Sequence, residues 1–393
     1  MSLNVKHIYS SAIKTLLMVS SMSLLMTACS EDSSDMQEDR DVLQIIPFTR
    51  PFTDEGQLQT RADAPYDNIT LPTDYLIFRN LYPQASSEYA SIHAYLIEKG
   101  TTNVNTQGNF VYDYTKEELY TDNFITNTGW SSNVHLRAGK EYYLYGFMPA
   151  SLTPSASISS NNGSYENKAI ININGIDAVT PADVSVITGA KGFDTPITDP
   201  STTGEVELGI FYYKGKEKDK NYIYLLLDHL FACINLEYTV DAEYSKWRKI
   251  ILREVTIAPS DNTPKRNLTV TINGGSYEVS DTEVTGSISG SANVYNEPNA
   301  TGYIPIEGVT PLSVPGYFTP TLNSAFKITS TYDVYDTENN LVRTGCTAEN
   351  KLQLNVTDPA RGNCYTVKFV ITPTYLYQLS EPDLDNPTIS VGS

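Results

Sequence analysis

The sequence has few of the residues that bind metals, nucleic acids or phosphate. Its 393 residues include 4 His, 4 Cys and 2 Trp, and 46 Asp and Glu outnumber 27 Lys and Arg, for a net charge of −19. Such an acidic chain is a poor partner for nucleic acid, because gripping a phosphate backbone depends on Lys and Arg. The four histidines lie far apart along the chain, and four cysteines are too few for a disulfide scaffold.

Motifs that carry catalysis are also missing. The chain has no G-x-x-x-x-G-K-[ST], no G-x-S-x-G and no H-E-x-x-H. Asp228-His229 could be combined with later serines into a triad, but the sequence does not supply the geometry that defines one. Asp383 and Asp385 could bind Ca²⁺ or serve acid–base chemistry, but they stand between two prolines, which is typical of a turn. We therefore expect no enzyme activity, no cofactor and no metal site.

The N-terminus has the pattern of a lipoprotein signal peptide. Lys6 and Lys14 precede an apolar run over 16–26, which is too short to span a bilayer, since spanning takes about 20 residues. Cys29 directly follows Met26-Thr27-Ala28, which resembles a bacterial lipobox. The prediction is a signal over 1–28 that is removed, with palmitate or similar acyl chains on Cys29; the alternative is an ordinary signal peptide followed by a cysteine by chance.

An acidic tether over 29–41 follows the lipidation site. Removal of 1–28 takes away Lys6 and Lys14 and no acid, so the net charge moves from −19 to −21. Acidic residues directly after the lipidated cysteine are similar to the address of surface lipoproteins in Bacteroidetes. A solvated tether would have the same composition. We expect a surface-exposed protein of the cell outer membrane.

Beyond residue 40 the pattern is that of β-strands. Apolar residues alternate with polar ones over 234–241 and 365–372, which puts one face on a core. Asn-Gly and Gly-Gly pairs between the strands favour tight turns. Helical pattern is confined to 114–120 and 242–247. Further strands are expected at 42–48, 92–97, 141–148, 169–173, 222–227, 250–257, 268–272, 326–335 and 351–356.

The length and the strand pattern predict an all-β protein with two sandwich domains. We place the boundary in the proline-containing stretch 258–267, which gives an N-terminal domain over 42–260 and a C-terminal domain over 261–393. Cys346 and Cys364 flank an expected hairpin and are a candidate disulfide, since export permits one. The 28 tyrosines fit either a contact surface or strand propensity.

Several segments together resemble the fimbrillin family of Bacteroidales, which are lipoprotein-exported pilus subunits. The resemblance spans most of the chain after the signal, and the order of the segments carries it. They are the lipobox with its acidic follow-on, V-L-Q-I-I-P-F-T-R (42–50), R-A-G-K-E-Y-Y-L-Y-G-F-M-P-A (137–150), D-H-L-F-A-C-I-N-L-E-Y (228–238) with K-I-I-L-R-E-V-T-I (249–257), and G-N-C-Y-T-V-K-F-V-I-T-P-T-Y-L-Y (362–377).

The resemblance implies two tandem transthyretin-like β-sandwich domains and assembly by strand exchange. A first strand would plug the N-terminal sandwich until an Arg-specific protease removes it, and a strand of a neighbouring subunit would then fill the groove. The plug would comprise Val42, Leu43, Ile45, Ile46 and Phe48. The candidate cut sites are Arg50, which Pro51 follows, and Arg61, which is the better one.

The predicted function is a structural subunit of a cell-surface fimbria that contributes to cell adhesion. The C-terminal donor would lie within 374–391, but two prolines interrupt this tail, which favours a minor, tip or anchor subunit over a stalk subunit. The expected partners are other pilus subunits, the lipid anchor before processing, and a receptor on a host or bacterial surface. The alternative function is a glycan-binding surface lipoprotein of a polysaccharide-uptake system.

Overall fold

The structure is nearly all β. The computed structural model describes residues 43–54, 69–70, 76–77, 90–119, 125–193, 205–206, 211–213, 221–260, 262–273, 276–320, 325–354, 359–376 and 381–391. Most of these residues lie in strands, and the helices among them are short 3-10 turns at Ala150–Ser155 and Tyr244–Lys246. No helix in these ranges is long and apolar enough to cross a membrane. The all-β prediction is confirmed.

A nine-stranded sheet dominates the first half of the chain. In order across the sheet the strands are β4 (Leu76–Ile77), β1 (Leu43–Thr49), β15 (Asn221–His229), β12 (Ser185–Phe193), β8 (Lys140–Met148), β5 (Ser91–Glu98), β6 (Thr106–Leu119) and β7 (Ile125–Ser132), and β14 (Phe211–Tyr213) also pairs with β8. Alternation along β8 sends Tyr142 and Leu144 into one apolar cluster and Tyr145 and Phe147 into another, so both faces of this sheet are covered.

A four-stranded sheet packs against one face of the nine-stranded sheet. Its strands are β19 (Ser276–Ile288), β18 (Pro264–Asn273), β10 (Lys168–Ile176) and β9 (Ala156–Ser159). Ile171 of β10 and Val270 of β18 are fully buried in one cluster with Tyr145 and Phe147 of β8. We call these two sheets the N-terminal sheet pair.

Two further sheets form the C-terminal sheet pair. One contains β11 (Val179–Thr180), β21 (Leu312–Phe318), β16 (Ala232–Val240), β24 (Asn363–Leu376), β2 (Thr53–Asp54) and β25 (Glu381–Val391). The other contains β20 (Ala292–Asn296), β17 (Lys249–Pro259), β22 (Ala325–Tyr335) and β23 (Leu341–Gln353). Leu236, Leu252, Ile328 and Phe369 join both sheets in one core. A separate ribbon pairs β3 (Ile69–Thr70) with β13 (Glu205–Val206).

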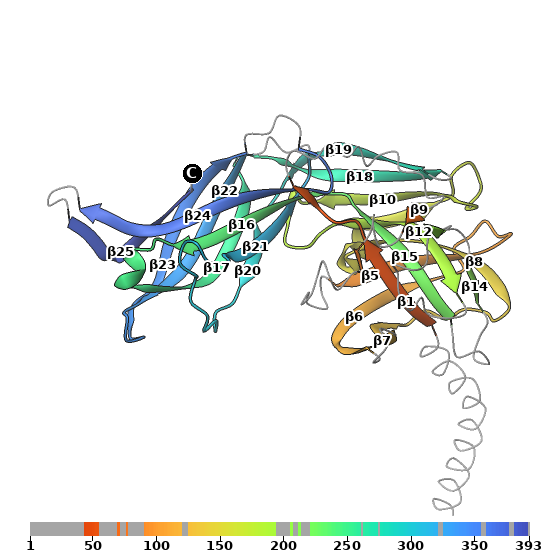
Figure 1. Cartoon of the computed structure of the whole chain (residues 1–393). Helices are drawn as coiled ribbons and strands as arrows, with labels where there is room; N and C mark the ends of the chain where they lie inside the picture. The colour runs from red at the N-terminus through yellow and green to blue at the C-terminus, as the bar shows by residue number, and fades with distance from the viewer. Residues whose placement is uncertain are drawn as a thin grey trace, which may run out of the picture.

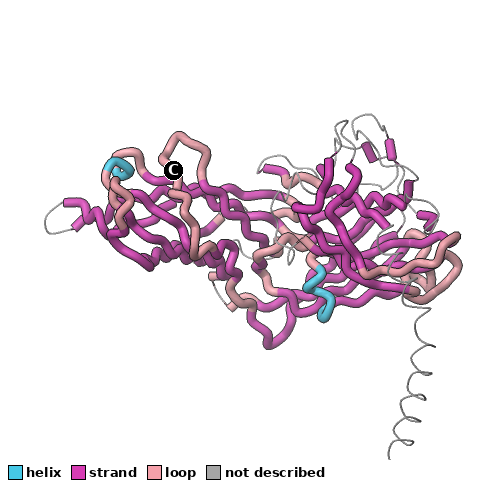
Figure 2. The backbone as a smooth tube through the Cα atoms, turned by 90° about the horizontal axis from the view of Figure 1, so that it is seen from below, coloured by secondary structure: helices cyan, strands magenta, loops and turns pink. Residues whose placement is uncertain are grey.

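The two sheet pairs lie end to end in an elongated molecule (Figures 1 and 2). Their strands do not follow one another in simple sequence order. β16 and β17 belong to the C-terminal sheet pair. β18 and β19 follow them in sequence but lie in the N-terminal sheet pair, where β18 pairs with β10 and β19 pairs with β18. Strands on both sides of residue 260 therefore share sheets, so no single position in the sequence separates the two sheet pairs.

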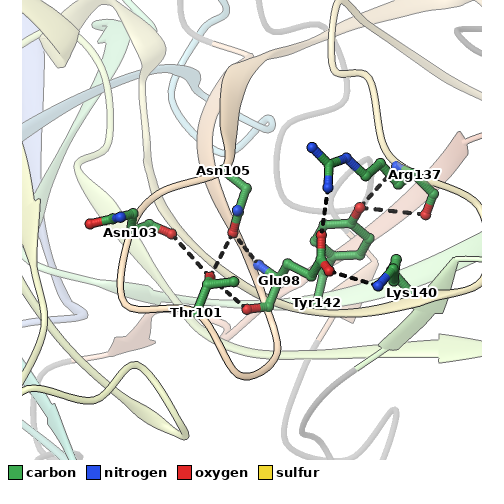
Figure 3. Close-up of polar contacts among 7 residues, drawn as sticks. All are labelled: Glu98, Thr101, Asn103, Asn105, Arg137, Lys140 and Tyr142. Atoms are coloured by element: carbon green, nitrogen blue, oxygen red, sulfur yellow. Dashed lines mark hydrogen bonds and ion pairs between the residues drawn. The ribbon is translucent and has the colours of Figure 1, made fainter.

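Side chains fix the turn that joins β5 to β6. The Thr101 hydroxyl donates to the Glu98 carbonyl at 2.7 Å, and the Glu98 carboxylate lies 3.0 Å from Lys140 Nζ and 3.8 Å from Arg137. The Arg137 backbone N–H donates to the Tyr142 hydroxyl at 2.8 Å (Figure 3). Since exposed ion pairs contribute about 0–1 kcal/mol, this group aligns the ends of β5 and β8 rather than holding the sheet together.

Asp333 of β22 is a buried carboxylate that the native fold keeps ionised. Arg253 Nε donates to its Oδ2 at 2.7 Å, and the Thr344 hydroxyl and Gly345 N–H each donate to Oδ1 at 2.8 Å. Burial alone would raise the pKa of Asp333, but the hydrogen bonds from Gly345, Arg253 and Thr344 outweigh it and hold this pKa below its ordinary value.

Asp333 should make the C-terminal sheet pair sensitive to acid. Because its pKa is lower in the folded state, its stabilising effect is complete above the unfolded-state pKa, about 3.9, and is lost as pH falls through the folded value. We expect Asp333→Asn to destabilise the protein at pH 7 and to have a smaller effect at pH 3, measured by thermal unfolding. Glu349→Gln, in an exposed pair with Lys327, is the control. If Asp333→Asn lowered the thermal stability by the same amount at pH 7 and at pH 3, the result would contradict the prediction.

Candidate functional site

β1, the predicted plug strand, lies near the edge of the nine-stranded sheet. It pairs in parallel with β15 along its whole length, from Leu43 opposite Asn221 to Thr49 opposite Leu227. On its other side the one strand in the described ranges is β4, which pairs with Phe48 and Thr49 alone. Pro47 has no N–H to donate, which fits a strand at a sheet edge. β1 can therefore leave by breaking one full ladder, that with β15.

The side chains of β1 are nonetheless buried on both faces. Ile45 and Phe48 are at most 1% exposed and Ile46 is 5% exposed. Ile45 joins the cluster that contains Ile223 and Leu225, and the Phe48 ring stacks on Tyr224 at 5.8 Å. At about 1.5–3 kcal/mol for each fully buried apolar side chain, the three contribute about 5–9 kcal/mol. That amount is comparable with the net stability of a whole domain.

A polar cluster holds the end of β1 where it leaves the sheet. We name Arg50, Asp183, Asp228 and His229 the Arg50 cluster. Arg50 Nε donates to Asp228 Oδ1 at 2.8 Å, and the Arg50 N–H donates to the Leu227 carbonyl at 3.2 Å. Asp228 is 1% exposed and the Arg50 side chain 13%. Because an ion pair removed from water is costly to break, this contact fixes the chain directly after β1.

His229 completes the Arg50 cluster. Its Nε2 lies 2.6 Å from the Arg50 carbonyl oxygen, which only accepts, so this nitrogen carries the proton of the bond. Its Nδ1 lies 2.7 Å from Asp183 Oδ2, which also accepts from the Ser185 hydroxyl at 2.7 Å. Since Ser185 bonds to the carboxylate and not to the imidazole, the group lacks the serine-to-histidine contact of a nucleophilic triad.

The chain then crosses to the C-terminal sheet pair. The Phe52 ring stacks on His229 at 3.8 Å and lies 5.9 Å from Tyr317. Thr53 N–H donates to the Gly362 carbonyl, the Thr53 hydroxyl donates to Asn363 Oδ1 at 2.6 Å, and β2 pairs in parallel with β24. In Figure 1 the red segment runs from β1 toward β24. Residues 43–54 therefore bind both sheet pairs.

Burial raises the pKa of Tyr277 beside the same cluster, and the neighbouring Asp228 carboxylate raises it further. The Tyr277 hydroxyl therefore stays neutral and hydrogen-bonded to Asp228 over the physiological range. Asp228 thus accepts hydrogen bonds from two groups, the Arg50 guanidinium and the Tyr277 hydroxyl.

The structure describes only some of the predicted site residues. Cys29, Val42 and Arg61 lie outside the described residues, while Leu43, Ile45, Ile46 and Phe48 all lie in β1. Arg50 is bound in its cluster. Of the candidate disulfide pair, Cys346 is buried in β23, while Cys364 lies in β24 with its Sγ 2.8 Å from Cys233 Sγ. Sequence reasoning missed the Cys233 contact and the Arg50 cluster because both depend on parallel pairing between strands far apart in sequence.

The C-terminal tail is bound to its own chain. β25 forms an antiparallel ladder with β24. The Tyr244 and Tyr332 hydroxyls donate to the carbonyls of Leu384 and Pro387 at 2.7 Å, and Asn350 Nδ2 donates to that of Ile389. The bonds from Tyr332 and Asn350 come from the sheet that faces β24, and Tyr244 lies in the short 3-10 helix between β16 and β17. The tail is thus integrated into the C-terminal sheet pair.

Burial accounts for more than half of the tyrosines. Among the described residues the exposed large aromatic side chains are Tyr212, Trp247 and Tyr303, and they come from separate strands and loops. The tyrosine content therefore reflects strand propensity and core packing more than a contact surface.

No model of a known protein family matches the sequence, and no curated protein matches it. Solved structures that it resembles are fimbrial and candidate adhesion proteins of Bacteroidales. A candidate cell adhesion protein from Bacteroides fragilis is 11% identical, with 90% of this chain and 97% of that chain covered and a TM-score of 0.40. A fimbrial protein from Bacteroides vulgatus is 13% identical, with 80% of this chain and 95% of that chain covered and a TM-score of 0.31. The fimbrial anchor protein Mfa2 from Porphyromonas gingivalis is 9% identical, with 88% of this chain and 96% of that chain covered and a TM-score of 0.24. Such scores alone establish neither fold nor role.

Proposed function

We propose that this chain is a subunit of a cell-surface fimbria, exported as a lipoprotein that carries its acyl chains on Cys29 and assembled through the removal of β1. The observation that carries the proposal is the position of β1. It is buried on both faces, yet one full ladder joins it to the sheet. A strand with these properties is replaceable, because another strand with the same apolar pattern can occupy its place.

Cleavage after Arg61 is the processing step of this proposal. It would separate the lipid and residues 43–54 from the rest of the chain while leaving β1 and β2 in place by their contacts. Release of the fragment would then open one edge of β15 and the surface around Ile223, Leu225 and Tyr224. Since such an edge is prone to uncontrolled pairing, the plug protects the subunit until a strand of a neighbouring subunit arrives.

A minor, tip or anchor position in the fimbria is the further part of the proposal. A donor tail has to leave its own subunit to reach the next one. Here β25 is paired with β24 and bonded to Tyr244, Tyr332 and Asn350 of its own chain. A tail bound in this way favours a subunit that accepts a strand over one that donates. The two sheet pairs would correspond to the two transthyretin-like sandwiches of such a subunit.

The protein isolated from its native outer surface tests the proposal. We expect a new N-terminus at Ala62 and no lipid on the polymerised form. Arg61→Ala should retain residues 30–61 and the acyl chains, and should abolish incorporation into fimbriae. Arg137→Ala is the control, because Arg137 is a highly exposed arginine away from β1. A wild-type protein that keeps an acylated Cys29 and residues 30–61 on the outer surface would overturn the processing step, and would leave an anchor subunit or a glycan-binding surface lipoprotein.

A further inference from the structure

Cys233 and Cys364 are direct neighbours in the C-terminal sheet pair. The parallel ladder between β16 and β24 begins at this pair, with Cys233 opposite Cys364. Neighbouring strands lie about 4.8 Å apart, within the Cα separation of about 4.4–6.8 Å that a disulfide spans. The sulfur atoms lie 2.8 Å apart, closer than unbonded sulfurs pack. The backbone and the side chains thus both have the geometry that cross-linking needs.

The third described cysteine is placed differently. Cys346 lies in β23 opposite Tyr332 and is 4% exposed within the C-terminal core. It belongs to the sheet that faces β16 and β24, and in the described ranges it has no contact with another cysteine. Cys346 therefore provides an internal comparison, a buried thiol in a different apolar cluster from Cys233 and without a sulfur partner among the described cysteines.

We propose that Cys233 and Cys364 form a disulfide when the protein is exported, which cross-links β16 to β24. The oxidant is a thiol–disulfide oxidoreductase of the export compartment. The thiolate of Cys364, which is partly exposed, attacks the disulfide of this enzyme and forms a mixed disulfide. The thiolate of Cys233 then attacks Cys364 Sγ and displaces the enzyme. The two thiols lose two protons and two electrons, and the enzyme disulfide is reduced to a dithiol.

Cys233 is the resolving partner in this sequence. It is buried, and the contact with Cys364 and the burial raise the pKa of its thiol well above the ordinary value. A thiol in this state is a poor first attacker. Cys364 is partly exposed, so it is the group that an enzyme can reach.

The cross-link lies where the N-terminal segment binds the C-terminal sheet pair. β2 pairs with β24 at Asn363 and Cys364, and Thr53 bonds to Asn363. In the proposed function, on which this step alone rests, removal of residues up to 61 takes β2 away from β24. The disulfide would then keep the start of β24 attached to β16 while its other edge is open.

Thiol labelling of the exported, full-length protein tests the cross-link. In denaturant without reductant, iodoacetamide should modify Cys346 and leave Cys233 and Cys364 unmodified. Peptide mapping should then show one linked pair that is lighter by two hydrogen atoms than the two reduced peptides. Reductant should lower the Tm by roughly 5–15 °C, since a disulfide that closes a long loop stabilises by about 2–4 kcal/mol.

Three variants distinguish a loss of stability that comes from the missing disulfide from one that comes from altered core packing. Cys233→Ala and Cys364→Ala should each lose the dependence of Tm on reductant, and each should expose the partner thiol to iodoacetamide. Cys346→Ala removes a buried thiol from the core between the two sheets of the C-terminal sheet pair, so its Tm changes through packing while the dependence on reductant stays. Labelling of both Cys233 and Cys364 without reductant, or a linked peptide that contains Cys346, would overturn the inference. None of these readouts depends on cleavage after Arg61.

Discussion

Phe48→Ala should release the N-terminal fragment at least a hundredfold faster than the wild type, once the chain has been cut after Arg61. Replacing a buried phenylalanine by alanine costs about 3–5 kcal/mol, and every 1.4 kcal/mol corresponds to a factor of about ten. Phe48 is 1% exposed and stacks on Tyr224, and this contact is lost before the fragment departs. Native mass spectrometry measures the fraction of chains that retain the fragment after limited digestion with an Arg-specific protease.

Phe326→Ala is the matched control for this experiment. Phe326 is fully buried in the C-terminal core, so the same change in the side chain lowers the overall stability without touching β1. We expect its Tm to fall while its rate of fragment release stays near that of the wild type. Equal release rates in Phe48→Ala and the wild type would show that contacts of β1 do not limit its departure.

Asp228→Asn should destabilise the protein by about 3 kcal/mol, the lower end of what removing one partner of a buried ion pair costs. The amide keeps the shape of the side chain, but it leaves the Arg50 guanidinium without its charge partner and weakens the bond with Tyr277. The effect should concentrate in residues 43–54. Urea unfolding measures the total loss of stability, and hydrogen exchange of the amides of β1 and β2 shows whether the loss is concentrated there.

Asp385→Asn removes a carboxylate of the same kind from an exposed pair. Asp385 contacts Arg248 and is 56% exposed, so the expected cost is below about 1 kcal/mol. If both variants lost the same stability, or if exchange in residues 43–54 stayed at the wild-type rate in Asp228→Asn, the Arg50 cluster would have no role in holding β1.

Much of the strand content could be predicted from alternation. The expected strands at 42–48, 222–227 and 268–272 lie within or overlap β1, β15 and β18, because each has one set of apolar residues that a sheet can bury. Turn chemistry was equally informative: Asn162 and Gly163, which form an Asn-Gly pair, both have positive φ angles. The helix expected at 114–120 is wrong for its described part, because 114–119 belong to β6, where pairing with β7 overrides the helix preference of Lys-Glu-Glu.

The candidate site was less accessible to sequence reasoning. The predicted plug strand was chosen from its apolar residues and the resemblance, whereas the polar contacts at its end could not be predicted. Asp228 and His229 stand side by side in sequence, yet Arg50 and Asp183, which they bind, come from segments far from them in the chain. Only the parallel ladder between β1 and β15 brings Arg50 beside them. For the same reason the contact between Cys233 and Cys364, which lie 131 residues apart, could not be predicted from the sequence.

The repeated crossing of the chain between the two sheet pairs has a mechanical consequence. Residues 49–53, 176–179, 180–185, 229–232, 259–264 and 288–292 each join a strand of one sheet pair to a strand of the other. A pull along the long axis of the molecule is therefore shared among several covalent connections in parallel. Cleavage after Arg61 and release of the fragment, as proposed, would remove the first of them together with β1 and β2 and leave the others to bear the load. A subunit built in this way can lose its N-terminal segment under tension without separating into halves.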